Sequence, residues 1–222
     1  MSHRLTLCGQ TLIARTSGAL FWPEQALLCV SDLHLGKSER LARRAGALLP
    51  PYETRDTLMR LEAEIEATRA SRVICLGDSF DDAASLDGLD EGERLWLLRL
   101  IAGRDWLWIA GNHDAGPLDI AGSHRAEACI GRLRFRHIAE PEDHGEVSGH
   151  YHPKARLAGK AWPCFLADEA RLILPAFGTY TGGLWTHDPA LAGLMGPKAL
   201  AVLCGGTQAR VIPMPRTAPR TR

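Results

Sequence analysis

The stretch ALLCVSDLH, residues 26–34, ends a run of apolar residues with an aspartate and a histidine. A short apolar run of this kind is typical of a buried β-strand. Asp32 and His34 come directly after the point where that strand would end. In open α/β sheets, ligands bind at the carboxyl ends of the strands. The stretch therefore predicts a strand and, at its end, part of a functional site.

The same junction between an apolar run and a polar side chain recurs four more times along the chain. The later junctions are RVICL (72–76) with Asp78, DWLWIA (105–110) with Asn112, His113 and Asp114, LRFR (133–136) with His137, and GEVS (145–148) with His150 and His152. Each junction alone has an ordinary explanation as a turn, a cap or a solvated side chain. All five together carry Asp, Asn or His at a strand end, and this repetition indicates one shared site.

The residue types at these junctions indicate metal binding. Imidazole suits borderline transition metals, and carboxylate or amide oxygen suits harder ions such as manganese. No cysteine lies in the five blocks, which argues against a structural zinc site of the cysteine type. The candidate ligands are Asp32, His34, Asp78, Asn112, His137, His150 and His152. Seven ligands are too many for one ion with an open position, and they fit two ions that share a bridging carboxylate.

Two divalent ions held by two carboxylates and a bridging hydroxide keep a small net positive charge. Such a site attracts an anionic phosphate, and a water between two cations is acidified. Ions about 3.5–4 Å apart also clamp the attacking and leaving oxygens of an in-line displacement. The ligand set therefore points to phosphoester chemistry.

The order of the periodic segments predicts the fold class. Helical patterns occupy residues 38–45, with Ser38 as the N-cap, then 54–70, with Leu58, Leu61 and Ile65 as the apolar stripe, and 91–102, with Leu95, Leu98 and Ile101. After about residue 131 the pattern becomes strand, turn and strand. This order predicts an α/β chain with mixed sheets, and two packed sheets with helices outside would hold so many short strands. We expect one domain over residues 1–213 and a flexible, basic, Pro-rich tail over 214–222.

Composition excludes several classes of protein. The chain has 222 residues, 45% hydrophobic and 23% charged, with a formal net charge of zero. A neutral chain has no global basic field, so any contact with nucleic acid must use a local patch. The six cysteines form no CxxC pair, which suits reduced thiols in the cytosol. No apolar run reaches the ~18 residues of a membrane span, and no secretory signal is expected, so we predict a cytoplasmic protein without membrane contact.

The motif series D-x-H, G-D-x-x-D, G-N-H-D, H and G-H-x-H, from Asp32 to His152, resembles the calcineurin-like metallophosphoesterase superfamily. That resemblance implies binuclear metal enzymes built from two mixed sheets packed face to face and flanked by helices, an αββα sandwich. A narrower likeness covers residues 18–190, through GALFWP, DLHLGK, LLPPYETRDTL, LGDSF, GRDWLWIAGNHD, GEVSGHYHPKAR and LPAFGTYTGGL. These stretches resemble the bacterial DNA-ligase-associated DNA damage response endonucleases. The narrower resemblance implies a phosphodiesterase acting on DNA in repair, with a DNA ligase or helicase as possible partners.

The resemblance also implies a role for each candidate ligand. Asp32, His34 and His152 would bind the first ion, Asp78 would bridge both ions, and Asn112, His137 and His150 would bind the second ion. His113 would stand near the phosphate as a general acid, and Asp114 would orient it. His144 competes with His137 for its place, but it lies in the polar loop EPEDHGE, so His137 is preferred.

Position 81 departs from the narrower family. There LGDSF is commonly followed by His, whereas this chain has Asp81, which fits the G-D-x-x-D pattern of the wider superfamily. A further carboxylate near the ions would lower the positive charge of the site. Any role carried by a histidine at this position is therefore in doubt.

Candidate substrate contacts flank the metal blocks. Lys154 and Arg40 could hold a nucleic-acid backbone, although a solvated surface is the alternative for both. Tyr180 could stack on a base, with packing at the rim as the alternative. Asp81 is a further candidate contact. The glycines of the segment 181–183 either let backbone approach the site or form only a turn.

Together these features predict a phosphodiesterase that depends on two divalent metal ions. We expect Mn2+, with Fe2+ or Zn2+ as alternatives. We expect an endonuclease that hydrolyses DNA in repair by in-line attack of a metal-bridging hydroxide. Two alternatives remain open at this point. One is a small-molecule phosphatase or cyclic-nucleotide phosphodiesterase, and the other is a catalytically silent metal-binding scaffold in a repair complex.

Overall fold

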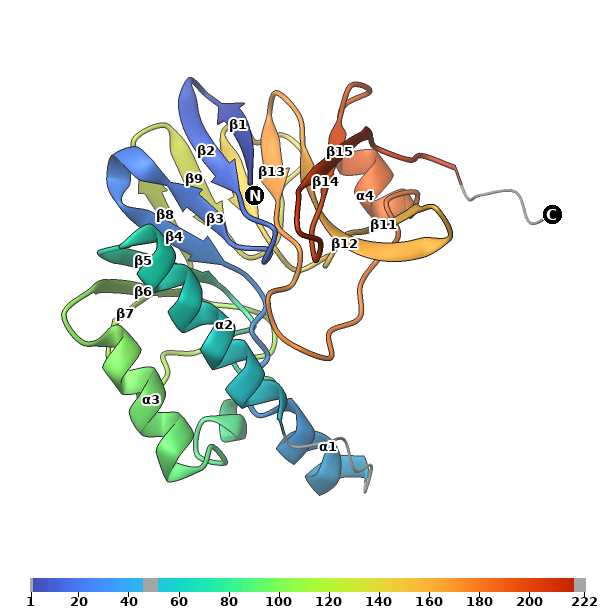
Figure 1. Ribbon diagram of the computed structural model, residues 1–222. Helices are drawn as coiled ribbons and strands as arrows, with labels where there is room; N and C mark the ends of the chain where they lie inside the picture. Colours follow the sequence, from blue (N-terminus) through green and yellow to red (C-terminus); the bar gives the residue numbers. More distant parts are fainter. Residues whose placement is uncertain (1, 46–51, 218–222) are drawn as a thin grey trace.

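Two mixed β-sheets pack face to face at the centre of the protein, and helices flank them (Figure 1). The computed structural model describes residues 2–45 and 52–217. The α/β class and the two-sheet architecture expected from the sequence are confirmed. The two sheets bring residues that are far apart in the chain to the same edge.

The first sheet has seven strands in sequence order, β1 to β7. The first four pair antiparallel, and the pairs β4–β5, β5–β6 and β6–β7 are parallel. Parallel strands place their carboxyl ends at one edge, so the polar residues after β4, β5 and β6 meet there. The strands are β1 (His3–Leu7), β2 (Gln10–Ala14), β3 (Leu20–Trp22), β4 (Leu27–Val30), β5 (Arg72–Leu76), β6 (Asp105–Ile109) and β7 (Ser123–Arg125).

The second sheet has the strand order β15-β14-β12-β13-β10-β9-β8, and β11 pairs with β12 outside this path. The neighbours β9 and β10 are parallel, so the residues that follow them also lie at one edge. The strands are β8 (Glu127–Ile130), β9 (Leu133–Arg136), β10 (Glu146–Ser148), β11 (Lys154–Leu157), β12 (Lys160–Ala167), β13 (Arg171–Ile173), β14 (Leu200–Leu203) and β15 (Arg210–Pro213).

Strand β5 shows how the first sheet is buried on both faces. Its side chains alternate, as a period of two requires. Val73 and Cys75 belong to the core under the helices, whereas Ile74 and Leu76 belong to the core between the sheets. A parallel sheet covered on both sides needs a continuous apolar run, which explains the sequence RVICL.

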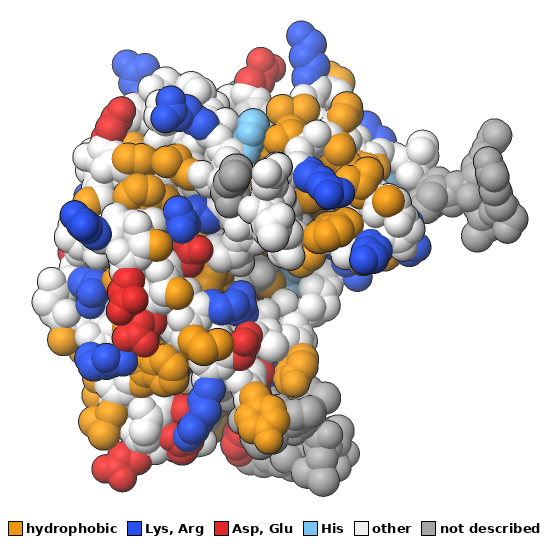
Figure 2. All heavy atoms as spheres, viewed as in Figure 1, with side chains coloured by type: hydrophobic (Ala, Val, Ile, Leu, Met, Phe, Trp, Pro, Cys, Tyr) orange, Lys and Arg blue, Asp and Glu red, His pale blue; other side chains and the backbone are white. Residues whose placement is uncertain are grey.

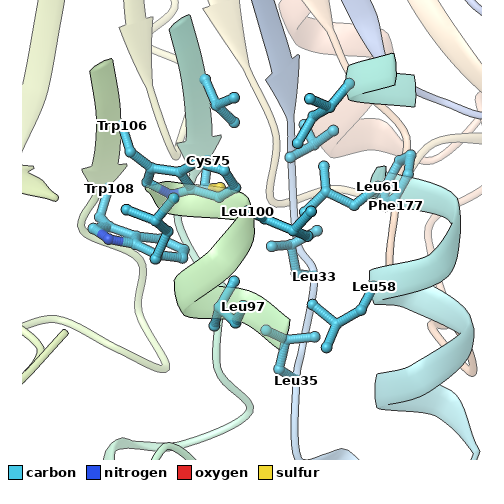
Figure 3. Close-up of a cluster of buried hydrophobic side chains, with 14 of the residues drawn as sticks. Leu33, Leu35, Leu58, Leu61, Cys75, Leu97, Leu100, Trp106, Trp108 and Phe177 are labelled. Atoms are coloured by element: carbon cyan, nitrogen blue, oxygen red, sulfur yellow. The ribbon is translucent and has the colours of Figure 1, made fainter. Parts of the chain in front are cut away.

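The helical layer covers the outer face of the first sheet. In Figure 3, Leu97 and Leu100 of α3 lie beside Trp106 and Trp108 of β6, and Leu58 and Leu61 of α2 point toward Leu33 and Leu35 after β4. The stripe predicted for α2 is confirmed, because Leu58, Leu61 and Ile65 are all buried. The helices are α1 (Lys37–Ala45), α2 (Glu53–Thr68), α3 (Glu91–Ile101) and α4 (Pro189–Leu194), with 3-10 turns η1 (Pro23–Gln25) and η2 (Ala83–Ser85).

The stripe predicted for α3 is wrong in part. Leu97, Leu100 and Ile101 are buried, whereas Leu95 is 59% exposed and Leu98 is only half-buried. The segment EGERLWLLRLI has apolar residues on more than one face, so its periodicity allows more than one stripe. Packing against α2 and the sheet selects one face.

The N-cap predicted at Ser38 is also wrong. Helix α1 begins one residue earlier, at Lys37. Both the backbone N–H and the hydroxyl of Ser38 donate to Glu53 Oε1, at 2.8 and 2.6 Å. A carboxylate from α2 therefore satisfies the free N–H of this helix start, and it does so across the tertiary structure.

The described part of the C-terminal tail lies against α4. Met214 is buried, and the Arg216 guanidinium donates to the carbonyl oxygens of Met195 at 2.9 Å and Ala192 at 3.2 Å. The rest of the predicted tail, 218–222, lies outside the described residues. Among the helices described, none has both the length and the apolar character needed to cross a membrane.

Candidate metal centre

The structure brings all seven predicted ligands together between the strand ends of the two sheets. Asp32, His34, Asp78 and Asn112 come from the first sheet, after β4, β5 and β6, and His137, His150 and His152 come from the second, after β9 and β10. Among the described residues, three groups of potential ligand atoms form there, and the atoms in each lie within 4.8 Å of one another. Two consist only of predicted ligands, Asp32 with His34 and His152, and Asp78 with His137 and His150, and the third joins His34 to Asp81 and His113.

The first group has the features of an ion site. Asp32 Oδ1, His34 Nε2 and His152 Nε2 are buried atoms without a hydrogen-bond partner. Asp32 Oδ1 and His152 Nε2 lie 3.0 Å apart without the geometry of a hydrogen bond. Burying such atoms unpaired costs free energy unless something binds them. Three potential metal-ligand atoms, none with a hydrogen-bond partner, lie close together, and this arrangement fits a divalent cation.

The second group is centred on His137. Its Nε2 lies 3.3 Å from Asp78 Oδ2, 3.0 Å from Asn112 Oδ1 and 3.3 Å from His150 Nδ1. Its Nδ1 donates to the Leu76 carbonyl at 2.7 Å, which leaves Nε2 free to accept a metal. The alternative His144 is exposed in its loop, away from this group. The structure therefore supports the choice of His137.

The charges around the two groups favour ionised carboxylates. Burial acts to raise the pKa of Asp32, but the adjacent His152 and His137 rings hold it below the ordinary value. Burial likewise opposes ionisation of Asp78, yet His137 and the His113 amide keep its pKa well below the ordinary value. Ionised carboxylates are the form that binds cations.

Five of the seven ligands have left-handed backbone conformations. The φ angles are +55° at Asp32, +47° at His34, +47° at Asp78, +68° at His150 and +45° at His152. Residues other than glycine seldom adopt this region. Such conformations gather at functional sites, where the surrounding structure holds them. Here each one turns a side chain inward just after a strand ends.

The glycines before the ligands permit close backbone packing. A Cβ at Gly149 would lie 1.7 Å from Ser31 Oγ, one at Gly111 would lie 2.1 Å from the Asp78 nitrogen, and one at Gly77 would lie 2.5 Å from His137 Nδ1. In the sequence, these glycines stand only as letters of the motifs. Their recurrence before Asp78, Asn112 and His150 was the signal for this packing.

Asp114 has a different role from the one expected. Its Oδ1 accepts from the backbone N–H groups of Asp78 and Gly111, and its Oδ2 accepts from those of Ser79 and Phe80, at 2.7–3.2 Å. The expectation that Asp114 orients His113 is therefore wrong. The carboxylate holds the loop that carries Asp78, because four nearby amides need an acceptor after β5 and β6 end.

His113 lies beside the second group, with its side chain one-third exposed. Its backbone N–H donates to Asp78 Oδ1 at 2.8 Å, and its Nε2 lies 4.0 Å from Asp78 Oδ2. Its Nδ1 lies 2.9 Å from the Asp81 carbonyl oxygen. A carbonyl oxygen only accepts, so Nδ1 carries the hydrogen and Nε2 faces the centre. The backbone of Asp81 thus orients His113.

Two of the candidate substrate contacts are paired with each other inside the protein. Asp81 is fully buried, and its carboxylate binds His34 Nδ1 at 2.8 Å and the Arg40 guanidinium. Burial opposes its ionisation, but His34, Lys37 and Arg40 hold the pKa of Asp81 below the ordinary value. Asp81 is therefore buried against the candidate ligand His34 rather than open to a substrate, and Arg40 pairs with its charge.

The other two candidates remain available at the surface. Tyr180 is 45% exposed and has a left-handed φ of +61°. Lys154 lies over the ring of Trp185, with its Nζ 4.8 Å from the centroid. Trp185 was not predicted from the sequence, because a lone tryptophan in a loop forms no pattern.

The two glycines of this loop differ. A Cβ at Gly183 would lie 2.0 Å from the His152 carbonyl oxygen, whereas Gly182 faces open space.

Comparisons with known proteins agree with this geometry. The crystal structure of Pseudomonas putida nuclease MPE is similar, with a TM-score of 0.70 and 25% sequence identity, over 96% of this chain and 100% of that chain. Among the curated proteins, none matches this chain. Residues 26–207 match the calcineurin-like phosphoesterase family, and this range contains all seven ligands. The chain belongs to the calcineurin-like phosphoesterase family and is a metal-dependent phosphoesterase.

Proposed function

We propose that the protein is a two-metal phosphodiesterase that cleaves DNA internally. The observation that carries the proposal is the pair of adjacent ligand groups, Asp32 with His34 and His152, and Asp78 with His137 and His150. Asn112 would complete the second group, since its Oδ1 lies 3.0 Å from His137 Nε2. Mn2+ is the ion we expect, because the ligands mix imidazole with carboxylate and amide oxygen.

Asp78 would serve both ions. It follows β5, the strand between β4 and β6, whose ends supply ligands to the first and second group. The bound ions would neutralise phosphate oxygens and acidify a water for in-line attack. The task of the chain is to hold the carboxylates and imidazoles in fixed orientations, through the left-handed turns and the support from Asp81 and Leu76.

His113 would act on the leaving oxygen. Its ring is partly exposed beside Asp78, and Nδ1 is fixed by the Asp81 carbonyl. In its protonated form, Nε2 would donate a proton to the departing oxygen of the diester. A positioned proton donor of this kind contributes about 10²–10⁴-fold to rate.

DNA is supported as the substrate by the likeness to a nuclease and by basic side chains on one face of the molecule. The similar structure from Pseudomonas putida is named a nuclease. In Figure 2, basic and acidic side chains alternate over α2 and α3, whereas basic side chains without acidic neighbours appear over β12 and α4. Action in DNA repair, beside a ligase or helicase and in the cytoplasm, belongs to the same proposal. The cysteines, none of which forms a disulfide, suit a reducing compartment.

The test compares three substrates with the Mn2+-loaded protein: supercoiled plasmid DNA, bis-p-nitrophenyl phosphate and p-nitrophenyl phosphate. We expect nicking of the plasmid and turnover of the diester. Turnover of the monoester alone would contradict the nuclease proposal. No turnover of any substrate with both ions bound would favour a catalytically silent scaffold.

The matched variants for this test are Asp78→Ala and Asp87→Ala. Asp78→Ala should lose both ions by metal analysis and all turnover, since one carboxylate serves both groups. Asp87 is an exposed carboxylate on the same connection, and its variant should behave like the wild type. An Asp78→Ala protein that retains two ions per chain would contradict the bridging role.

A further inference from the structure

Trp185 carries two cations on its ring. Lys154 Nζ lies 4.8 Å from the centroid, and the Arg156 guanidinium carbon lies 5.0 Å from it. The ring of His187 stacks against the same indole, with centroids 6.2 Å apart and planes within 10°. Cation–π contacts of this kind hold a charged group in place without neutralising it.

The two cations lack the carboxylate partner that several other cations among the described residues have. Arg40 pairs with Asp81, and Arg136 pairs with Glu146 and other carboxylates. Within residues 2–45 and 52–217, neither Lys154 nor Arg156 forms an ion pair with a carboxylate. Lys154 is half-buried and Arg156 is exposed, so both charges can still meet an anion from outside.

This cluster is built onto the metal centre through the backbone. Strand β11 begins at Lys154, two residues after the ligand His152. The segment with Trp185 pairs alongside it, because Lys154 N–H donates to the Leu184 carbonyl at 2.9 Å and Thr186 N–H donates to the Lys154 carbonyl at 3.0 Å. Gly183 packs directly on the His152 carbonyl. The loop therefore holds a fixed position beside a metal ligand.

The spacing of the cations suits a chain of phosphates. Lys154 and Arg156 are alternate residues of one strand, so their side chains leave the same face. With a rise of about 3.3 Å per residue, their Cα atoms stand about 6.6 Å apart. This separation is comparable to one nucleotide step in an extended strand. Lys154 and Arg156 thus follow the candidate ligand His152 along the chain, two and four residues after it.

We infer that Lys154 and Arg156, held over Trp185, form a subsite for the backbone phosphates of the DNA strand next to the cleaved bond. This inference rests on the proposed DNA cleavage and adds the direction in which the strand leaves the centre, along β11. Contacts to phosphates fix the register of a nucleic acid without reading its sequence. A groove of this type also follows the backbone of single strands.

The main experiment compares a single-stranded oligonucleotide with bis-p-nitrophenyl phosphate, which has no flanking phosphates. In the double variant Lys154→Ala/Arg156→Ala, the ratio of kcat/KM for the oligonucleotide to that for the small diester should fall at least tenfold. The salt dependence of oligonucleotide binding, measured by fluorescence anisotropy, should lose about 1.4 from its log–log slope, since each phosphate contact on a single strand contributes about 0.7.

Four further variants separate charge from position. Trp185→Leu keeps both charges but removes the aromatic face, and it should lower the same ratio; Trp185→Phe should restore it. Arg132→Ala/Lys198→Ala removes the same charge from exposed positions elsewhere and should leave the ratio unchanged. Arg156→Gln, at an exposed position, gives a single-residue test that does not threaten the fold.

The outcomes distinguish this inference from the proposed function. An unchanged ratio and salt slope in the double variant, with metal content and melting temperature intact, would overturn the subsite. A wild-type protein that turns over the small diester but not DNA would overturn the proposed substrate. Anisotropy would still decide the subsite in that case, because loss of oligonucleotide binding in the Lys154, Arg156 and Trp185→Leu variants, but not in Arg132→Ala/Lys198→Ala, would support it, and equal binding by all variants would overturn it.

Discussion

Asp81 contacts two histidines of the metal centre with different groups. Its carboxylate meets His34 Nδ1 at 2.8 Å, and its carbonyl oxygen meets His113 Nδ1 at 2.9 Å. Both contacts put the ring hydrogen on Nδ1 and turn Nε2 inward. A carboxylate behind a metal-binding histidine fixes its orientation and raises its basicity. One residue thus supports a ligand by its side chain and the candidate acid by its backbone.

Removing the Asp81 carboxylate should weaken metal binding. We expect Asp81→Ala to lower the affinity for Mn2+ by about 10–100-fold, because His34 loses its support and Arg40 loses its partner. Asp81→Asn should lose less, since it retains an acceptor for His34. Isothermal titration calorimetry with Mn2+ measures the change, with Asp87→Ala as the control. An unchanged affinity in Asp81→Ala would remove the supporting role.

His113 should separate chemistry from metal binding. We expect His113→Ala to keep both ions by metal analysis and to lower kcat on bis-p-nitrophenyl phosphate by about 10²–10⁴-fold. The ring lies beside Asp78 but belongs to neither of the two proposed metal groups, so metal content should not change. His144→Ala is the matched control, because His144 is exposed in a loop. An unchanged kcat would exclude His113 as the acid.

At the scale of elements, the strand ends and the loops after them build the centre. Four of the five ligand blocks leave their strands through a left-handed residue or a glycine, the block with His137 being the exception, and neighbouring loops then touch backbone to backbone. Asp32 N–H donates to the Gly77 carbonyl at 3.2 Å, His34 N–H to the Asp78 carbonyl at 2.9 Å, and Gly178 N–H to the Asp32 carbonyl at 3.0 Å. These loops continue the hydrogen bonding of the sheets past their last residues.

The glycine pair 182–183 tests this packing. Gly183→Ala should destabilise the protein by about 1–3 kcal/mol, because the new methyl group overlaps the His152 carbonyl and the φ of +155° is strained for alanine. Gly182→Ala meets no atom within 4 Å and should change stability little. Urea unfolding of the two variants measures the difference. Equal stabilities of the two variants would show that the loop can move away from the His152 carbonyl at little cost.

At the scale of the whole molecule, the helical layer and the two sheets form separate buried clusters that meet at the first sheet. Trp106 and Trp108 lie with Leu61 and Leu100 beneath α2 and α3 (Figure 3). Phe135, Phe165 and Leu172 lie between the sheets. This packing sets the parallel strands at fixed positions and therefore sets the distances between ligands.

Neighbouring residues of α2 test the contribution of the helical layer. Leu58 is fully buried, whereas Met59 is 55% exposed. Leu58→Ala should cost about 2–5 kcal/mol in the free energy of unfolding, because it leaves a cavity under the helix. Met59→Ala should stay within about 0.5 kcal/mol of the wild type. Urea denaturation measures both, and a similar cost at the two positions would contradict the packing described.

The sequence by itself predicted the fold class, which the structure confirms, together with the strand ends and the seven candidate ligands. The physical reason is that these features are local: an apolar run defines a buried strand, and Asp or His directly after it stands at a sheet edge. His137 could be preferred to His144 on this ground alone. The stripe of α2 was readable for the same reason, since its charged residues leave only one apolar face.

Only the tertiary structure decided which groups meet. Asp114 accepts hydrogen bonds from the loop after β5, and the carboxylate of Asp81 contacts His34 instead of facing a substrate. Glu53, rather than Ser38, caps the start of α1. The buried face of α3 and the cations over Trp185 were fixed in the same way. Each of these contacts joins residues from different elements, and its energy depends on packing and burial that no local pattern contains.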